Sequence, residues 1–552
     1  MDTSHIAAAA LPGYPDRRAL LAADPEQRRQ MLAEFVRSAC ARLTGRPIGD
    51  EPDLFLESLQ ATELQILVES QLEIELSLLD LVPPFGIDDL VTVLDDALAS
   101  GPARSQVPVV VPEVSGRFEP FGLTDVQHAY WLGRSGLFDL GDVSTHVFLE
   151  FESVGFDVPR VESVLSRLVE RHDMLRAVIR SDGRQQVLAD VPQIRVAIED
   201  LTGCSEAEQE HRVQLMRERL SHEVRPSEVW PLFEVSGQLL ASGLTRVYLS
   251  LDLLIADAAS IRLLLAEFAT LFENPDTVLT PLELTFRDYV SALAGVESGE
   301  NFDRARAYWS ARVVSLPAAP QLPVVPAEAG VATRFVRRSG GLDVVRWEGL
   351  RVVAGRWGVT VSAVLLAAYA EVLGVWSKSS RFTVNVTVGD RLPVHSQVEG
   401  VVGDFTSLVL VEVDGLGVGF GERVRRVQEQ LWRDLEHRAF GGVRVLRELA
   451  QVRGPVEASM PVVFTSALGA PMPGRDGVLP GLGRFVGGVS QTPQVFLDYQ
   501  VFEQAGSLVV SWDAVEAVFE PGVLDAMFGA HQALLERLVD EPQLWERPGS
   551  AV

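Results

Sequence analysis

The triplet Glu57-Ser58-Leu59 contains a serine at the point where a short loop gives way to an apolar run with helical spacing. Most serines at a helix N-terminus cap the helix with their hydroxyl group. A serine there can instead carry a phosphodiester, because the first N–H groups and the helix dipole stabilise an anion. The residues alone leave both interpretations open.

Two carboxylates, Asp252 and Asp257, lie five positions apart in a stretch that contains no histidine. Val247 to Leu251 alternates like a strand, and an apolar helical pattern begins near Ala258, so the pair spans a strand-to-helix loop. We favour a mainly structural role: one buried, ion-paired aspartate and one helix cap, with Asp257 directly before the helix.

Histidine and cysteine chemistry is not favoured by the sequence. His128, His146 and His172 are scattered through apolar contexts, where a lone histidine is more often a packed core residue than a catalyst. Cys40 and Cys204 are too few for a disulfide framework or a cysteine-based zinc site, and they fit a reducing compartment. We therefore expect no metal.

Charge and composition exclude further classes of function. The chain has 48 basic and 76 acidic residues, a formal charge of −28, whereas binding to nucleic acid or to anionic membranes needs a basic face. Lys378 is the single lysine and follows no glycine loop, so neither a P-loop nor a lysine-dependent adenylating site is predicted. The N-terminus lacks a signal-peptide pattern, which predicts a cytoplasmic protein. The most apolar stretch, residues 359–376, contains Ser362 and Glu371 and predicts a buried helix.

The region around Ser58 predicts a small helical bundle. Its expected helices begin at Asp24-Pro25 and end before Gly45, run from Ser58 to about Leu72, and cover Leu90 to Leu98. Residues 51–100 contain twelve acidic residues and no lysine or arginine. They form either a solvated acidic surface or a docking face for basic partners.

From Phe118 onward, strand-like runs alternate with helical ones, which predicts an α/β body of two lobes joined near the proline-rich stretch 316–323. Expected strands cover residues 247–251, 382–388 and 407–413, and an expected helix covers 258–272. We divide the chain into a flexible N-terminal tail (1–23), the bundle (24–100), a proline-containing linker (101–117), a first lobe (118–325) and a second lobe (326–552).

Residues 53–64 resemble the phosphopantetheine attachment region of acyl and peptidyl carrier proteins. In that family an Asp-Ser-Leu triplet opens the second of four helices. Here Glu57 stands in place of the aspartate, and Phe55 stands where a glycine is common. The resemblance implies that residues 24–100 are a carrier domain and that a phosphopantetheinyl transferase attaches 4'-phosphopantetheine to Ser58.

Seven later segments resemble, in order and spacing, the signatures of heterocyclization domains of nonribosomal peptide synthetases. They are residues 120–134, 171–176, 316–323, 359–376, 403–406, 461–466 and 490–498. One such match would be weak, but seven in order are specific, and they span residues 118 to about 545. A carrier before such a domain is similar to thiazoline siderophore synthetases of the pyochelin and yersiniabactin type, where the carrier holds an aryl acid.

This resemblance implies an α+β protein, with a small four-helix carrier bundle and a V-shaped pair of chloramphenicol-acetyltransferase-like α/β lobes around a tunnel. Ordinary condensation domains carry a His-His-x-x-x-Asp-Gly motif on the loop that here holds Asp252 and Asp257. Heterocyclization domains have two aspartates five apart, which Asp252 and Asp257 match. In the family these two residues shape the tunnel.

The resemblance also implies catalytic roles for Thr465 and Asp498, which by themselves are an ordinary strand threonine and a strand-end carboxylate. A carboxylate can accept the proton of an attacking nucleophile and return one to a leaving oxygen, and a hydroxyl can relay it. Further candidates, each with a structural alternative, are the amide hydrogen-bond donors Gln491 and Gln494, the tunnel residues Asp404 and Thr406, and the phosphate ligand Arg134.

The implied reaction joins a carrier-bound acyl thioester to cysteine, serine or threonine on a second carrier and cyclodehydrates the product to a thiazoline or oxazoline. Downstream peptidyl carrier and adenylation domains are the implied partners, on other chains or on a longer one. Three alternatives stay open. They are a condensation domain that forms only the amide, a coenzyme A-dependent acyltransferase, and a non-catalytic scaffold that docks carriers. The sequence leaves the acyl group and the cyclised residue undetermined.

Overall fold

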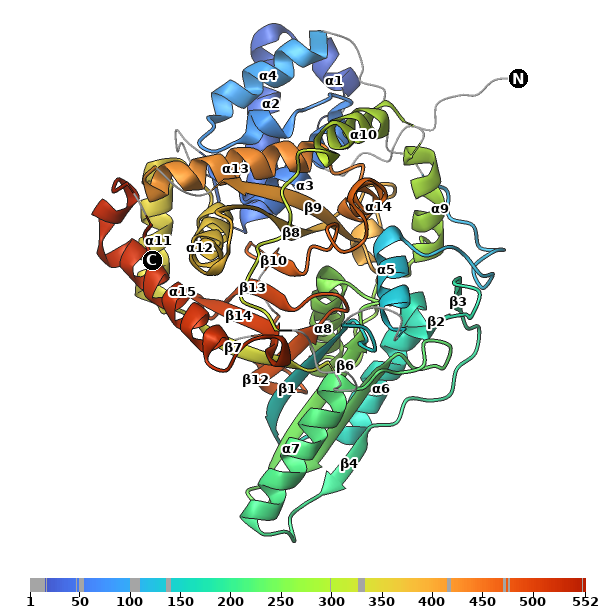
Figure 1. Ribbon diagram of the computed structural model, residues 1–552. Coiled ribbons are helices and arrows are strands. Elements are labelled where there is room, and N and C mark those ends of the chain that lie inside the picture. The colour runs from blue at the N-terminus through green and yellow to red at the C-terminus, as the bar shows by residue number, and fades with distance from the viewer. Residues whose placement is uncertain are drawn as a thin grey trace.

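The computed structural model describes residues 15, 17–45, 47–48, 54–99, 110–135, 140–297, 299–325, 333–414, 418–469, 473–474, 477–548 and 550–552. A helical bundle lies above a body that contains two large sheets (Figure 1). Among these residues no single helix is long and apolar enough to cross a membrane. Two successive helices, Val344–Trp357 and Val361–Trp376, meet that test only as a pair bent by 98°.

The bundle consists of α1 (Arg17–Ala22), α2 (Pro25–Thr44), α3 (Ser58–Leu72), the 3-10 turn η1 (Leu78–Leu81) and α4 (Ile87–Ala99). Asp24 caps α2 by accepting a hydrogen bond from the Gln27 amide at 2.9 Å. Gly45 ends the same helix with a left-handed φ of 68°, a conformation that glycine adopts without strain. The three helices expected in this region are confirmed.

The expected tail over residues 1–23 is wrong for Arg17–Ala22, which forms helix α1. Leu20 is fully buried, and the Arg17 guanidinium donates to the Leu98 carbonyl oxygen at 2.9 Å. These two residues give the short helix an apolar and a polar anchor on the bundle. Residues 1–14 and 16, like Asp53 and the linker residues 101–109, lie outside the described residues.

The first sheet has the strand order β11-β12-β1-β6-β5-β4. Its strands are β1 (His146–Val154), β4 (Ala197–Asp200), β5 (Phe233–Leu239), β6 (Leu244–Asp252), β11 (Val478–Leu479) and β12 (Gly483–Gln491). Around it lie α5 (Asp125–Gly133), α6 (Val158–Arg171), η2 (Asp173–Arg176), α7 (Glu206–His222), α8 (Ala258–Glu273) and the hairpin of β2 (Ala177–Ile179) and β3 (Gln185–Val187). Strand β6 and helix α8 match the expected strand and helix and hold the loop with both aspartates.

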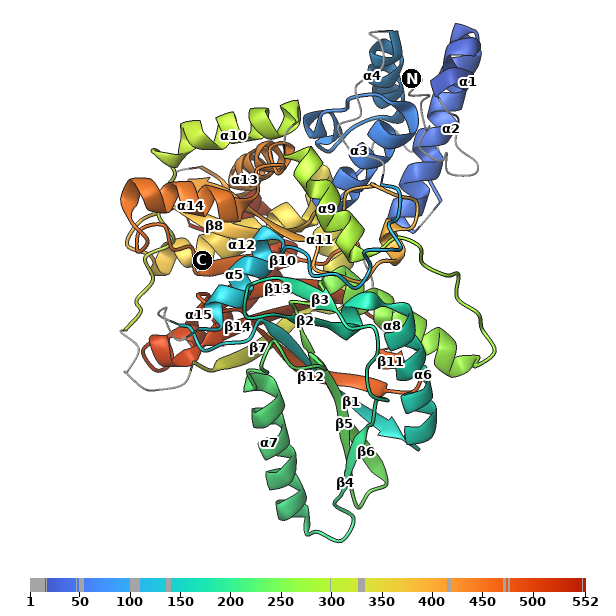
Figure 2. The ribbon, with the colours of Figure 1, turned by 90° about the vertical axis from the view of Figure 1, so that its right-hand side faces the viewer.

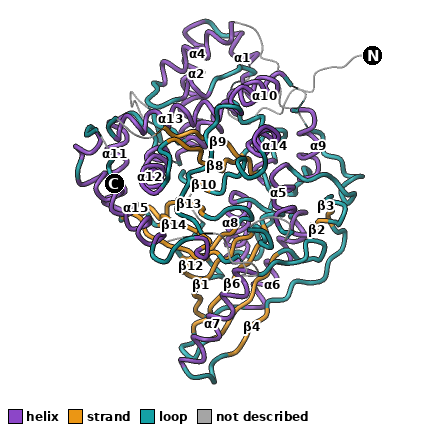
Figure 3. Tube along the Cα trace, in the orientation of Figure 1, coloured by secondary structure: helices purple, strands orange, loops and turns teal. Residues whose placement is uncertain are grey.

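The second sheet has the order β7-β14-β13-β10-β8-β9. Its strands are β7 (Phe335–Leu342), β8 (Arg381–Gly389), β9 (Thr406–Asp414), β10 (Val462–Ser466), β13 (Leu497–Gln504) and β14 (Ser507–Val515). The helices of this part are α10 (Glu300–Val313), α11 (Val344–Trp357), α12 (Val361–Trp376), α13 (Phe420–Glu436), α14 (Gly442–Arg453), η4 (Glu516–Val518), α15 (Val523–Asp540) and η5 (Pro542–Trp545). Helices α9 (Phe286–Val296) and η3 (Val398–Gly400) pack instead into the apolar cluster of the first sheet. Figure 3 shows the strands gathered in two groups with helices around them.

Two segments cross the boundary expected at residue 325. Strands β11 and β12 belong to the first sheet, because β12 pairs antiparallel with β1 and so satisfies the backbone groups of that edge. Helix α10, expected in the first lobe, packs on α14 through a shared apolar cluster that includes Trp309 and Leu449 (Figure 2). Each lobe therefore contains a piece of the other half of the sequence, which ties the two together.

Candidate active site

The centre of the second sheet carries polar side chains on one face. On the parallel neighbours β10 and β13, Thr465 pairs with Gln500, and Asp498 precedes Gln500 by two residues. Paired residues, and residues two apart on one strand, share a face, so these three side chains lie together. Asp513 on β14 pairs with Asp498, and Arg337 on β7 pairs with Asp513. The register thus extends a polar row over four adjacent strands.

Hydrogen bonds fix the orientation of this row. Arg337 Nε donates to Asp513 Oδ1 at 2.7 Å, and Arg337 Nη2 donates to Gln500 Oε1 at 3.0 Å. Because arginine has only donors, it holds the amide oxygen of Gln500 toward itself. The amide nitrogen of Gln500 is then free to donate to Asp498 Oδ2 at 2.7 Å. Arg337 therefore orients the group that holds Asp498.

The pKa of Asp498 is raised from 3.8 to about 6, first by burial and then by the negative charge of Asp513. The hydrogen bond from Gln500, the charge of Arg337 and the hydrogen bond from Thr465 lower it, but burial outweighs them. The Asp498 residue is 7% exposed. A carboxylate with a pKa close to neutral can accept a proton and return it, as general acid–base catalysis requires.

Thr465 stands between two hydrogen-bond partners, Asp498 and Thr387. Its Oγ1 lies 3.5 Å from Asp498 Oδ1 and 3.2 Å from Thr387 Oγ1 on the neighbouring strand β8. A hydroxyl has a single proton but can also accept, so Thr465 can donate to Asp498 or accept from Thr387. This arrangement lets a proton reach Asp498 through the threonine hydroxyl.

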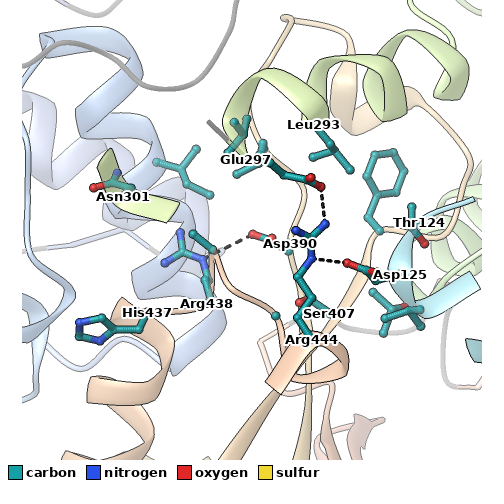
Figure 4. A pocket seen from close by; sticks show the side chains of 18 of the residues that line it. Thr124, Asp125, Leu293, Glu297, Asn301, Asp390, Ser407, His437, Arg438 and Arg444 are labelled. Carbon is teal, nitrogen blue, oxygen red and sulfur yellow. Dashed lines mark hydrogen bonds and ion pairs between the residues drawn. The ribbon is translucent and has the colours of Figure 1, made fainter. Parts of the chain in front are cut away.

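A cavity of about 240 Å³ opens between the bundle and both lobes. Figure 4 shows Arg444 between Asp125 of α5 and Glu297, and Arg438 directed toward Asp390. Arg444 Nε lies 2.5 Å from Asp125 Oδ2, and Arg438 Nε lies 3.5 Å from Asp390 Oδ1. The wall of the cavity is therefore charged, with arginines neutralised by carboxylates.

Asp404 and Thr406 line the same cavity at the start of β9. Asp404 Oδ1 accepts a hydrogen bond from the Thr406 amide at 3.0 Å, whereas Asp404 Oδ2 is buried and has no hydrogen-bond partner among the described residues. Burial raises the pKa of Asp404 from 3.8 to about 7, against the hydrogen bond from Thr406. Asp404 is thus a second carboxyl group whose proton is exchangeable near neutral pH.

Tyr130 lies near several of these carboxylates. Burial raises its pKa well above the ordinary value, and the negative charges of Asp404, Asp498 and Asp257 raise it further. The Tyr130 hydroxyl, on α5 of the first lobe, therefore lies within electrostatic range of carboxylates from both lobes.

Asp252 is held in an ion pair with Arg134 and accepts hydrogen bonds from Ser144 Oγ at 2.9 Å and from the Leu254 amide at 3.0 Å. Arg134 also donates to the carbonyl oxygen of Arg225. Arg134 is thus an internal ion-pair partner, which was one of its two expected roles. A buried aspartate with these partners fixes the turn that follows β6.

Asp257 caps α8 by accepting from the Ser260 amide at 2.7 Å, and its other oxygen lies 3.3 Å from the Phe405 amide. The Asp257 amide donates to the Gly403 carbonyl oxygen at 2.9 Å. Asp257 therefore joins the first lobe to the segment that carries Asp404. The ion pair and the helix cap expected from the sequence are both present.

The two glutamines lie apart from each other. Gln491, at the end of β12, donates from Nε2 to His146 Nδ1 at 2.8 Å, and its buried Oε1 has no partner among the described residues. Gln494 is exposed in a turn with a left-handed φ of 63°, on the rim of a separate cavity that Arg447 also lines. Gln491 is buried at the junction of the lobes, whereas Gln494 lies at the surface.

Ser58 is the first residue of α3 and is partly exposed. The carboxylate of the preceding Glu57 is directed at the body, where it accepts from the amides of Val361 and Ser362, each at 3.0 Å. The described residues contain no group of three or more histidine, cysteine, aspartate or glutamate side chains that could hold a metal ion.

Comparison with protein-family models decides the family. The model described as "Condensation domain" matches residues 123–547, most of the chain. The chain belongs to the condensation-domain family. The match covers the strands and helices of both lobes.

This condensation domain is 39% identical to pyochelin synthetase PchF of Pseudomonas aeruginosa over 428 residues, which are 77% of this chain and 24% of PchF. It is 35% identical to pyochelin synthetase PchE of the same organism over 537 residues, 95% of this chain and 36% of PchE. The chain thus spans about a quarter to a third of these relatives. The solved cyclization-docking bidomain of EpoB from Sorangium cellulosum matches with a TM-score of 0.74 and 38% identity, covering 83% of this chain and 90% of that one. The expected mixed helix-and-sheet condensation fold is confirmed.

Several residues in or near the condensation domain's polar row were not singled out from the sequence: Gln500, Asp513 and Arg337 in the row, and Thr387 and Tyr130 near it. The spacing of Asp498 and Gln500 along one strand was an available signal, because residues two apart share a face. Arg337 carries no such signal, since its place depends on which strands become neighbours.

Proposed function

We propose that the chain is a carrier–heterocyclization didomain of a nonribosomal peptide synthetase. In this proposal residues 24–100 are the carrier domain, 101–117 the linker, and 118–325 with 326–552 the two lobes of the heterocyclization domain. The reaction joins a carrier-bound acyl group to cysteine, serine or threonine on a second carrier and closes a thiazoline or oxazoline ring. The similarity to pyochelin synthetase PchE over 95% of the chain, bundle included, supports this organisation.

The observation that carries the proposal is the contact between Thr465 and Asp498. Ring closure requires a base for the attacking thiol or hydroxyl and an acid for the oxygen that leaves as water. Asp498, with a pKa raised to about 6, can serve as both in succession. Thr465, 3.5 Å from Asp498 Oδ1, passes the proton between the substrate and the carboxylate.

The other residues of the site position these two. Gln500 donates to Asp498 Oδ2 and leaves Oδ1 on the side of Thr465. Arg337 holds Gln500 in that orientation. Asp404 supplies a second proton donor on the cavity wall, and Asp257 fixes the backbone next to it. We assign Gln491 and Asp252 to the support of this arrangement through His146 and Arg134.

Ser58 fits the attachment of 4'-phosphopantetheine. Its hydroxyl is partly exposed at the first position of the fifteen-residue helix α3, where N–H groups and the helix dipole stabilise a phosphate. The carboxylate of Glu57 is directed toward α12. When bound, the group supplies a thiol for an acyl thioester. The required partners are a phosphopantetheinyl transferase, an adenylation domain and a downstream peptidyl carrier.

Mass spectrometry of the reconstituted reaction tests this function. The chain is treated with coenzyme A and a phosphopantetheinyl transferase, loaded with an aryl donor, and mixed with a cysteinyl-loaded carrier. We expect modification at Ser58 and a product one water lighter than the amide. An amide that accumulates without losing water identifies a condensation domain that does not cyclise, and a loaded protein that forms no amide identifies a scaffold.

Two variants test the site itself. Thr465→Ala and Asp498→Ala should fold, since each removes a side chain without adding bulk, and both should abolish ring formation. Circular dichroism checks the fold. If ring formation survives in both variants, the assignment of these residues is wrong.

A further inference from the structure

The carboxylate of Glu57 caps a helix of the catalytic body. Val361 and Ser362 open α12, a helix that is almost wholly buried, and their amides donate to Glu57 Oε1 and Oε2 at 3.0 Å each. The first N–H groups of a helix have no partner within it. Thr360 satisfies only the next one, from Ala363, at 3.2 Å. Glu57 therefore supplies acceptors that the helix itself does not provide at a buried end.

The body caps the bundle in return. Glu436, the last residue of α13, accepts a hydrogen bond from the amide of Leu78 at 2.7 Å, and Leu78 is the first residue of η1. Around this pair, Arg438 Nη1 donates to Gln65 Oε1 at 3.1 Å. The apolar residues of the bundle and of the second sheet's lobe form one continuous buried cluster. The interface is thus packed and has a charged cap on each side.

The identity of residue 57 fits this contact. The carrier pattern has aspartate at this place, and an aspartate is shorter by one methylene, about 1.5 Å. Both oxygens of Glu57 are used at ordinary hydrogen-bond length, so a side chain shortened by that amount cannot reach both amides. The departure from the carrier pattern therefore has a structural use in this chain.

The same contact leads toward the catalytic strand. Ser362, which donates to Glu57, also places its Oγ 2.9 Å from Ser466 Oγ. Ser466 directly follows Thr465 on β10, and Ser58 directly follows Glu57. In the docked bundle, a short series of contacts through Glu57, Ser362 and Ser466 thus connects Ser58 to Thr465.

We propose that Glu57 and Glu436 form a reciprocal capping latch that docks the N-terminal bundle on the body and favours the donor carried by Ser58 over donors on other chains. The preference for the Ser58-borne donor rests on the proposed function. The docking itself does not, because it follows from contacts between described residues.

Hydrogen–deuterium exchange of the full chain tests the docking. A hydrogen bond to a charged group contributes enough that its loss should speed exchange at Val361 and Ser362 about tenfold in Glu57→Asp and Glu57→Gln. Glu436→Gln should do the same at Leu78, and each variant should also speed exchange at the opposite cap. Glu26→Gln, an exposed glutamate in the first turn of α2, is the matched control. Unchanged exchange at Val361 and Ser362 in both Glu57 variants overturns the latch.

A competition assay tests the preference. Ser58 carries one donor, a separate carrier offers a second donor of different mass, and the ratio of the two products is read after a single turnover. We expect the wild-type chain to favour the Ser58-borne donor and Glu57→Asp to lower that ratio several-fold. A general folding defect lowers both products equally, so an unchanged ratio overturns the preference. If Ser58 is never modified, the exchange result still decides the docking.

Discussion

The two aspartates at the loop after β6 and Asp498 on the second sheet are all buried, but they are held in different ways. In the first lobe, Asp252 forms an ion pair with Arg134 and accepts further hydrogen bonds. Asp257 accepts hydrogen bonds from the backbone amides of Ser260, in the first turn of α8, and of Phe405. On the second sheet, Asp498 has one short hydrogen bond, from Gln500, and one at 3.5 Å, from Thr465. Their surroundings therefore differ in how completely fixed donors satisfy the carboxylate.

This difference distinguishes carboxylates that stabilise the fold from a carboxylate that can transfer a proton. A carboxylate with rigid donors on both oxygens fixes the elements that hold those donors. A buried carboxylate with fewer donors, next to a second negative charge, binds a proton more readily, as Asp498 does beside Asp513. Such a group is costly to the fold and useful to a reaction, which is why perturbed pKa values gather at functional sites.

Asp498→Asn should give the largest effect. Asparagine keeps the shape, and its oxygen can still accept from Gln500, but it cannot take a proton. Loss of a general base typically costs about 10²- to 10⁴-fold, so the rate of ring formation should fall by that amount. Single-turnover mass spectrometry measures it. A variant that cyclises within tenfold of wild type would show that Asp498 is as structural as Asp252.

Asp252→Asn should mainly lower the stability of the protein, in contrast to Asp498→Asn, which should mainly lower the rate of ring formation. The substitution leaves the buried guanidinium of Arg134 without a counter-charge, and breaking a buried ion pair costs about 3–5 kcal/mol. Urea unfolding followed by fluorescence measures the loss. Per folded molecule, ring formation should fall far less than in Asp498→Asn. A variant that is stable but inactive would place Asp252 among the catalytic residues.

The sequence predicted best what depends on neighbouring residues. The strand, loop and helix around Asp252 and Asp257 are local, so residue types sufficed to expect an ion pair and a cap. The start of α2 at Asp24-Pro25 is local too. Thr465 and Asp498 were expected through the family resemblance alone, because nothing in their immediate surroundings sets them apart.

What the sequence did not predict depends on which distant segments become neighbours. Arg337 meets Asp513 only because β7 pairs with β14, and the return of β12 to the first sheet joins residues far apart in the chain. Glu57 appeared as a departure from the carrier pattern. The role of Glu57 as a cap depends on α12, whose first amide donates to the Glu57 carboxylate from a distant part of the sequence.

The raised pKa of Asp498 predicts a pH-dependent difference in stability between wild type and Asp498→Asn. The folded pKa of about 6 lies above the ordinary 3.8, so the folded state binds a proton more tightly than the unfolded state. Asp498 therefore lowers the stability of wild type as the pH rises from about 4 through about 6, and the asparagine variant lacks this contribution. At pH 8 the variant should be more stable by about 3 kcal/mol. Unfolding in urea at pH 4 and pH 8 measures this, and an equal difference at both values contradicts it.

Asp257→Asn should have the smallest effect of the four. Asparagine and aspartate are almost equivalent as helix caps, so the Ser260 amide keeps its acceptor and α8 keeps its start. The second oxygen becomes an amide nitrogen that faces the Phe405 amide at 3.3 Å, and Arg391, 3.5 Å from the first oxygen, loses its negatively charged partner. The loss of these two attractions should cost about 1 kcal/mol. Thermal unfolding at pH 7 measures the change. A loss as large as that of Asp252→Asn would mean that the link from Asp257 to the Asp404 segment, rather than the helix cap, stabilises this junction of the lobes.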